Sequence, residues 1–187
     1  MEKIQSSIVF VTQNPHKLQD AQRLLPHLHI EHIDFFVPEI QSLDVQEVAA
    51  YKLQYAFQKV RRPCFVMDAA LGLDCVHGFP GPFIKFWFAQ SVGAERTCAI
   101  AHALKAPGCT WTTVLGYTDG EKNHYFKESI RGVVASTPLG SEGYDWDTIF
   151  IPESQPKTLA QMSFDEKQSY AVTRKLLAQF DAFLSSL

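Results

Sequence analysis

The stretch VQEVAAYKLQYAFQKV, residues 45–60, has the pattern of a half-buried amphipathic helix. Its apolar side chains recur every three or four positions, and this spacing places them on one helix face. Lys52 falls within that stripe, one turn after Val48 and one turn before Ala56. A lysine on an apolar face costs stability unless its stem reaches solvent or its ammonium group meets an anion. We therefore predict a helix here and ask what Lys52 contacts.

The segments around this helix predict an α/β fold. Apolar runs and alternation indicate strands at 8–12, 29–37 and 63–68, and amphipathic spacing indicates helices at 17–25, 83–92 and 94–105. Asp119-Gly120 predicts a hairpin within 110–136. Ser163 and Glu166 form a capping-box pattern, so we expect a last helix from Ser163 through the KLLAQFDAFL segment. Early alternation of strands and helices followed by a hairpin favours a mixed sheet.

Composition narrows the functional classes. The chain has 187 residues, 46% hydrophobic and 20% charged, which fits one folded domain over 1–187. The formal net charge of -3 argues against a nucleic-acid binder, so we expect no nucleic-acid partner. No apolar run of about 18 residues and no signal-peptide pattern occur, so we expect no membrane partner. The four cysteines lack C-x-x-C spacing, and a reduced, cytoplasmic protein is the simplest interpretation.

Charged residues occupy positions where a strand is expected to meet a loop or helix. Lys17 follows Asn14-Pro15 at the first strand-to-helix junction, where free amide N–H groups and the helix dipole favour an anion. Asp68 ends the predicted strand CFVMD, Glu39 follows the second strand, and Asp147 lies in a glycine-flanked loop. Carboxylates from separate strand ends are ligands that Mg²⁺ uses together with substrate phosphates.

Further lysines lie in apolar surroundings. Lys85 stands between Ile84 and Phe86. Lys167 and Arg174 are seven residues apart and are expected on one face of the last helix. Several such cations, combined with the acids, describe a site for a polyphosphate that carries a divalent metal.

An ordered set of motifs supports this interpretation. They are FVTQNPHK, PEIQ, AAYKLQYA, VMDAALGLD, GFPGPFIKFW, GYDWDTIF and TLAQMSFDEK. Together they resemble, in order and over nearly the whole chain, the inosine triphosphate pyrophosphatases, which hydrolyse non-standard purine nucleoside triphosphates. The resemblance implies an elongated mixed sheet flanked by helices, two lobes with a central cleft, and a homodimer. It also implies a Mg²⁺-dependent hydrolase that converts ITP, dITP or XTP to the monophosphate and pyrophosphate.

The resemblance also implies a role for each matching residue. Glu39 and Asp68 would bind Mg²⁺, and Asp68 would orient or deprotonate the attacking water. The phosphate chain would be held by Thr12, Asn14, Lys17, Lys52 and Lys85. The base and sugar would be surrounded by Tyr144, Trp146 and Asp147, with Lys167 at the base end. On this interpretation Lys52 is tolerated because it reaches a phosphate, and Lys52→Met would stabilise the ligand-free protein.

The sequence departs from the family pattern at four places. Gln13 replaces the glycine of T-G-N-x-x-K, and Asp145 replaces a loop glycine. Met67 and Ala69 stand where the family has an acid and a hydroxyl residue. The family's Ser-His-Arg aligns with residues 171–173, which read Ala-Val-Thr.

These departures leave two alternatives open. The chain could have a changed base specificity, or it could bind nucleotides with weak or no catalysis. Arg174 is the candidate to replace the missing arginine, although it lies about 100° further round a helix.

Overall fold

The computed structural model describes residues 7–143, 145–170 and 172–187. The strands in these ranges are β1 (Ile8–Val11), β2 (Ile30–Ile33), β3 (Cys64–Leu73), β4 (Pro80–Gly81), β5 (Gly108–Thr118), β6 (Asn123–Val134) and β7 (Phe150–Pro152). The α-helices are α1 (Pro15–Leu24), α2 (Val45–Val60), α3 (Gly93–Ala103), α4 (Phe164–Gln168) and α5 (Val172–Ser185). Short helices complete the described ranges: η1 (Asp74–Val76), the π-helix η2 (Phe86–Ser91), η3 (Asp145–Thr148) and η4 (Leu159–Gln161).

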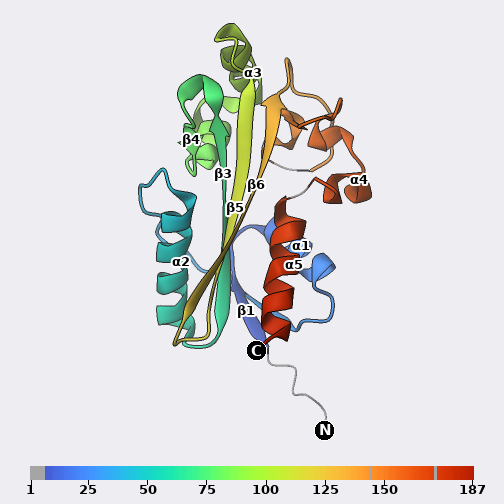
Figure 1. Ribbon diagram of the computed structural model, residues 1–187. Helices are drawn as coiled ribbons and strands as arrows, with labels where there is room; N and C mark the ends of the chain where they lie inside the picture. The colour runs from blue at the N-terminus through green and yellow to red at the C-terminus, as the bar shows by residue number, and fades with distance from the viewer. Residues whose placement is uncertain (1–6, 144, 171) are drawn as a thin grey trace.

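One mixed sheet organises the molecule, as the sequence predicts. Its order is β2-β1-β3-β5-β6-β7, and β4 pairs with β3. The pairs β1–β2 and β1–β3 are parallel, and the others are antiparallel. The long strands β3, β5 and β6 run the length of the molecule and join a lower lobe to an upper lobe (Figure 1).

Both faces of the sheet are covered in the lower lobe, with α2 on one side and α1 and α5 on the other (Figure 1). Side chains alternate between the faces along each strand. In β3, Cys64 and Val66 pack with Leu53 of α2, whereas Phe65 and Met67 pack with the α5 side. Since Asp68 continues the series of Cys64 and Val66, its side chain points toward α2.

The upper lobe has a core of its own. Trp111 of β5 packs edge-on against Trp146 and against Phe150, with ring centroids 6.0 Å apart in both pairs. Cys98 of α3 and Cys109 of β5 belong to the same buried cluster. This core holds η2 and η3 against the end of the sheet.

Several predicted elements have different lengths in the structure. The strand predicted at 29–37 is only β2, and the chain from Asp34 to Asp44 has no regular secondary structure. The strand predicted at 63–68 continues to Leu73, because β5 pairs with it at every position from Cys64 to Leu73. Asp68 therefore lies within a strand and does not end one.

The single last helix predicted from Ser163 is two helices. The capping box forms as predicted, with Ser163 accepting from the Glu166 amide and Glu166 accepting from the Ser163 amide. However, α4 ends at Gln168 and α5 starts at Val172. Lys167 and Arg174 are thus on different helices, and the expectation of a shared helix face was wrong.

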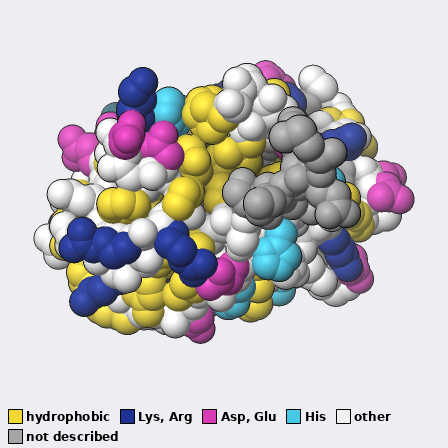
Figure 2. Space-filling view, turned by 90° about the horizontal axis from the view of Figure 1, so that it is seen from below, with side chains coloured by type: hydrophobic (Ala, Val, Ile, Leu, Met, Phe, Trp, Pro, Cys, Tyr) yellow, Lys and Arg dark blue, Asp and Glu magenta, His cyan; other side chains and the backbone are white. Residues whose placement is uncertain are grey.

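The lower end of the molecule carries charges of both signs. In Figure 2, hydrophobic side chains gather near the middle of this face, and basic and acidic side chains form separate groups beside them. No helix within the described ranges is long and apolar enough to cross a membrane.

Candidate active site

A cavity of about 430 Å³ lies between the two lobes. Its lower-lobe wall includes the β1–α1 junction, Lys52 of α2 and Asp68 of β3. Its upper-lobe wall includes Pro82, Lys85 and Trp146. The cavity forms beside Asp68 because β1 pairs with β3 only at Cys64 and Phe65. Past that point β1 turns into α1, which leaves the edge of β3 open.

The β1–α1 junction points the N-terminus of α1 at the cavity. Asn14 caps the helix, and its Oδ1 accepts from the amides of His16 at 2.9 Å and Lys17 at 3.2 Å. The Asn14 amide in turn donates to Thr12 Oγ1 at 3.1 Å. The sequence-based expectation of free amide groups at this junction was therefore wrong for His16 and Lys17, since a side chain already satisfies them. The helix dipole and the Lys17 ammonium remain as attractions for an anion.

Lys17 reaches across the junction to β3. Its Nζ donates to the backbone carbonyl of Met67 at 2.9 Å. Met67 thus offers its backbone oxygen to Lys17, while its side chain belongs to the buried cluster on the α5 side of the sheet. Gln13 lines the cavity too, and its Nε2 donates to Asp34 Oδ1 at 3.0 Å.

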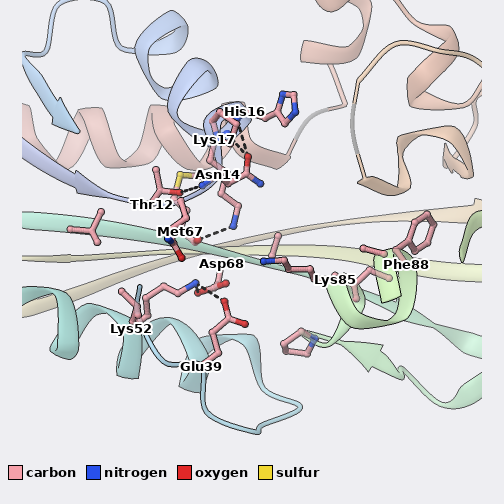
Figure 3. A pocket seen from close by; sticks show the side chains of 18 of the residues that line it. Thr12, Asn14, His16, Lys17, Glu39, Lys52, Met67, Asp68, Lys85 and Phe88 are labelled. Carbon is pink, nitrogen blue, oxygen red and sulfur yellow. Dashed lines mark hydrogen bonds and ion pairs between the residues drawn. The ribbon is translucent and has the colours of Figure 1, made fainter. Parts of the chain in front are cut away.

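Lys52 lies between two carboxylates (Figure 3). Its Nζ is 2.8 Å from Asp68 Oδ2 and 3.2 Å from Glu39 Oε1. Burial lowers the pKa of Lys52, but the neighbouring carboxylates of Asp68 and Glu39 raise it by more, so its pKa lies above the ordinary value. Lys52 is charged at neutral pH, and its side chain is only 15% exposed.

The partner of Lys52 in this structure is therefore a pair of acids. The position of Lys52 among apolar residues of α2 predicts that its removal stabilises the free protein. The two ion pairs reverse that expectation, since a methionine would leave Asp68, 13% exposed, without a counter-charge.

Lys85 comes from the opposite wall, just before η2, and points into the cavity (Figure 3). Phe88 of η2 lines the same wall. Lys17, Lys52 and Lys85 thus line one cavity from α1, α2 and the upper lobe. The sequence predicts this set from the apolar surroundings of Lys52 and Lys85 and from the place of Lys17 at a helix N-terminus.

Of the residues expected at the base, only Trp146 lines this cavity within the described part of the chain. Trp146 is buried and lines both the main cavity and a smaller adjoining one of about 20 Å³. Asp147 lines the smaller cavity and forms an ion pair with Lys167 of α4. Tyr144 lies outside the described residues. Arg174 is exposed on α5 and is not among the residues that line either cavity.

The smaller cavity includes Thr173, which aligns with the family's arginine, and Thr113, which the sequence analysis does not select. Thr113 and Thr173 are buried there, and the indole N–H of Trp111 donates to Thr113 Oγ1 at 3.0 Å. Alternation along β5 could have indicated that Trp111 and Thr113 share a face. Only the packing of α5 against the sheet brings Thr173 to the same place.

Comparisons with known proteins agree with this architecture. The model of the Ham1 family matches residues 8–183. An inosine triphosphate pyrophosphatase of Schizosaccharomyces pombe is 37% identical over 173 residues, covering 89% of this chain and 88% of its own. A dITP/XTP pyrophosphatase of Methanopyrus kandleri is 31% identical over 176 residues, covering 92% and 93%.

Solved structures show the same fold. The Ham1 protein of Staphylococcus aureus superposes with a TM-score of 0.80 at 23% identity, covering 97% of this chain and 99% of that one. A HAM1 protein of Coxiella burnetii gives a TM-score of 0.78 at 24% identity, again over 97% and 99%. The match along the sequence and the shared sheet lead to one conclusion: this chain belongs to the Ham1 family.

Proposed function

We propose that this chain is a nucleoside triphosphate pyrophosphohydrolase. It cleaves the α–β phosphoanhydride bond of non-standard purine nucleotides such as ITP, dITP and XTP. The products are the nucleoside monophosphate and pyrophosphate. The relatives named above act, by their names, on these nucleotides. The observation that carries the proposal is the convergence of three lysines, two carboxylates and a helix N-terminus on one cavity.

The donor set at Glu39 and Asp68 fits Mg²⁺. Two carboxylate oxygens from different segments converge on one cation position, which Lys52 fills in this structure. Within the described residues no group of three or more His, Cys, Asp or Glu is placed to hold a metal. One or two carboxylates, with waters and substrate phosphates, are the usual ligands of Mg²⁺. When bound, Mg²⁺ would neutralise phosphate charge and make a coordinated water more acidic.

The protein's own groups supply position and charge. Lys17, Lys52 and Lys85 hold the phosphate chain from three sides, and Thr12 and Asn14 position it at the start of α1. Asp68 orients the attacking water and accepts its proton as the water oxygen bonds to the α-phosphorus, and the bond from that phosphorus to the pyrophosphate leaving group breaks. Such catalysis depends on positioning and electrostatic stabilisation more than on covalent chemistry.

We place the base and sugar near Trp146 and Asp147, and Tyr144 and Lys167 are the further residues predicted to contact them. Trp146 offers an aromatic surface at the junction of the two cavities. A changed base specificity is the second candidate, because an uncharged Thr173 lines the small cavity at the position of the family's arginine, and Arg174 is exposed outside it. Under either candidate the reaction is the same.

The test is pyrophosphate release with Mg²⁺ from ITP, XTP, dITP, ATP, GTP, CTP and UTP. We expect release from ITP, XTP and dITP in preference to the standard nucleotides. Release from a standard nucleotide alone would support the second candidate, a pyrophosphohydrolase with a changed base specificity. Binding of these nucleotides without any release would instead identify a nucleotide-binding relative that has lost catalysis.

The remaining predictions concern the setting of the enzyme. We propose a single domain over 1–187, a homodimer and a cytoplasmic location. All four cysteines are free, and burial raises the pKa of Cys64 to about 11 and of Cys109 to about 12. Unpaired, protonated thiols suit a reducing compartment. Sedimentation equilibrium measures the oligomeric state directly, and a monomer at micromolar concentration would contradict the dimer.

A further inference from the structure

Lys52 occupies the position that a metal ion would need. Its ammonium group is 2.8 Å from Asp68 Oδ2 and 3.2 Å from Glu39 Oε1, the same two carboxylates that fit Mg²⁺. This ammonium forms an ion pair with each of the two acids and a hydrogen bond to Glu39, so it compensates their charge in the free protein. A divalent cation cannot approach these oxygens from the cavity while that ammonium remains between them, because the two cations repel each other.

The charges around the cavity disfavour a metal ion that arrives alone. Three lysines and two carboxylates line it, so its cations already outnumber its anions. A divalent ion alone would increase this excess. A triphosphate brings several negative charges with the metal, and it offers the displaced ammonium new oxygens to bind.

The Lys52 side chain can move its ammonium group from the carboxylates to a bound phosphate. Its ammonium ends a flexible four-carbon stem on the cavity side of α2, and lysine binds phosphate as a mobile point charge. The carboxylates that it leaves stay close to the edge of β3 and in the chain between β2 and α2. The exchange therefore requires a side-chain movement without a shift of the sheet.

We infer that Lys52 holds the cation position of the free protein and gives it up only when metal and triphosphate arrive together. The form of substrate that the site accepts is then the metal–nucleotide complex. This inference rests on the proposed function for the identity of the ligand. It goes further by making Lys52 the residue that couples the binding of the metal to that of the phosphates.

The test measures metal binding without turnover. Mn²⁺, which is visible by electron paramagnetic resonance, is titrated into the metal-free protein alone or with an ITP analogue that has a methylene group between its α and β phosphates. We expect the wild type to bind Mn²⁺ alone at least roughly tenfold more weakly than with the analogue, after correction for Mn²⁺ held by the free analogue. In Lys52→Met, Mn²⁺ alone should bind roughly tenfold more tightly than in the wild type.

Lys85→Met is the matched control. It removes a positive charge from the same cavity, but no ion pair of Lys85 with a carboxylate occurs within the described part of the chain. We expect it to change the affinity for Mn²⁺ alone by less than roughly threefold. Lys52→Gln provides a second variant if Lys52→Met does not fold, because glutamine keeps a hydrogen-bond donor without the charge.

Two results would overturn the inference. One is an unchanged affinity for Mn²⁺ alone in folded Lys52→Met or Lys52→Gln. The other is an equal gain in Lys85→Met, which would show that any lost charge has this effect. The comparison needs no hydrolysis, so a protein that couples Mn²⁺ to the analogue yet releases no pyrophosphate would contradict only the proposed function.

Discussion

Asp68 is the residue on which the proposed chemistry depends most. It faces the cavity from the middle of β3, half-buried, with one oxygen 2.8 Å from the Lys52 ammonium. Two facts determine this position: the alternation of side chains along β3, and the end of the parallel neighbour β1 at Val11. Under the proposed function, a carboxylate at this strand edge contacts both the metal and the phosphate chain.

Asp68→Asn should lower the turnover number for ITP by at least 100-fold, because an amide is a poor metal ligand and cannot accept a proton from water. The measurement is pyrophosphate release under saturating substrate. Asp74→Asn serves as the control, since Asp74 forms an ion pair with Arg131 at 2.7 Å but does not line the cavity. Equal activity of both variants, each with a native circular dichroism spectrum, would remove Asp68 from the mechanism.

Lys52→Met should lower the free energy of unfolding of the metal-free protein by about 1–2 kcal/mol, because it leaves Asp68 and Glu39 without their counter-charge. Urea unfolding at pH 8 measures the difference. A variant more stable than the wild type would contradict this prediction. It would show that a lysine on an apolar helix face costs more stability than its ion pairs contribute.

The stabilisation by Lys52 has a defined pH dependence. Since folding raises the pKa of Lys52, its contribution is fully present below the unfolded-state value of about 10.4 and is lost as pH rises through the folded-state value. The unfolding free energies of wild type and Lys52→Met should therefore converge as the pH rises through the folded-state pKa of Lys52. Both proteins contain the same tyrosines, so their titration cancels in the comparison. A difference that stays constant as the pH rises through this range would contradict the ion pairs.

At the scale of elements, helix termini place the charged groups. Asn14 caps α1 and Asp44 caps α2, each through a side-chain oxygen that accepts from backbone amides. The α1 cap lines the cavity, whereas Asp44 lies away from it. Asn14 and Asp44 therefore form a matched pair of helix caps, and only Asn14 lines the cavity.

Asn14→Ala and Asp44→Ala should each cost about 1 kcal/mol of stability, because each leaves amides of the first helical turn unsatisfied. Only Asn14→Ala should also weaken binding of the methylene analogue of ITP, by roughly tenfold, since the start of α1 holds the phosphates. Calorimetric titration measures the affinity, and urea unfolding measures the stability. An equal loss of affinity in both variants would exclude a specific phosphate site at α1.

The whole molecule places the cavity at the junction of its lobes. Lower-lobe residues such as Lys17 and upper-lobe residues such as Lys85 face each other across it, and the long strands β3 and β5 connect the two lobes. A ligand that contacts both walls stabilises each lobe, and it also stabilises the position of one lobe relative to the other.

Binding of the metal–analogue complex should therefore slow amide hydrogen exchange in both lobes. We expect protection in peptides covering 12–17 and 82–88, and no change at the β5–β6 turn, 119–122. At a free ligand concentration of 100 times Kd, the gain in unfolding free energy should be about 2.7 kcal/mol. Protection confined to one lobe would contradict a site shared between them.

Local sequence determined much of this fold. The period of apolar residues defined α2 from Val45 to Val60, the Asp119-Gly120 turn defined the β5–β6 hairpin, and Ser163 with Glu166 defined the start of α4. These features depend on interactions between residues within a few positions of one another, so the sequence alone is enough to predict them. The same holds for the expectation that Lys52 must meet an opposite charge.

The tertiary structure decided which charge that was. Pairing with β5 extended β3 past Asp68, and the end of β1 opened the strand edge beside it. Only then did Glu39, Lys52 and Asp68 come together from three separate segments. Strand extension, helix breaks and ion pairs of this kind depend on partners far apart in the chain. Local patterns could therefore select these residues, but only the packing of the sheet and helices brought them to one site.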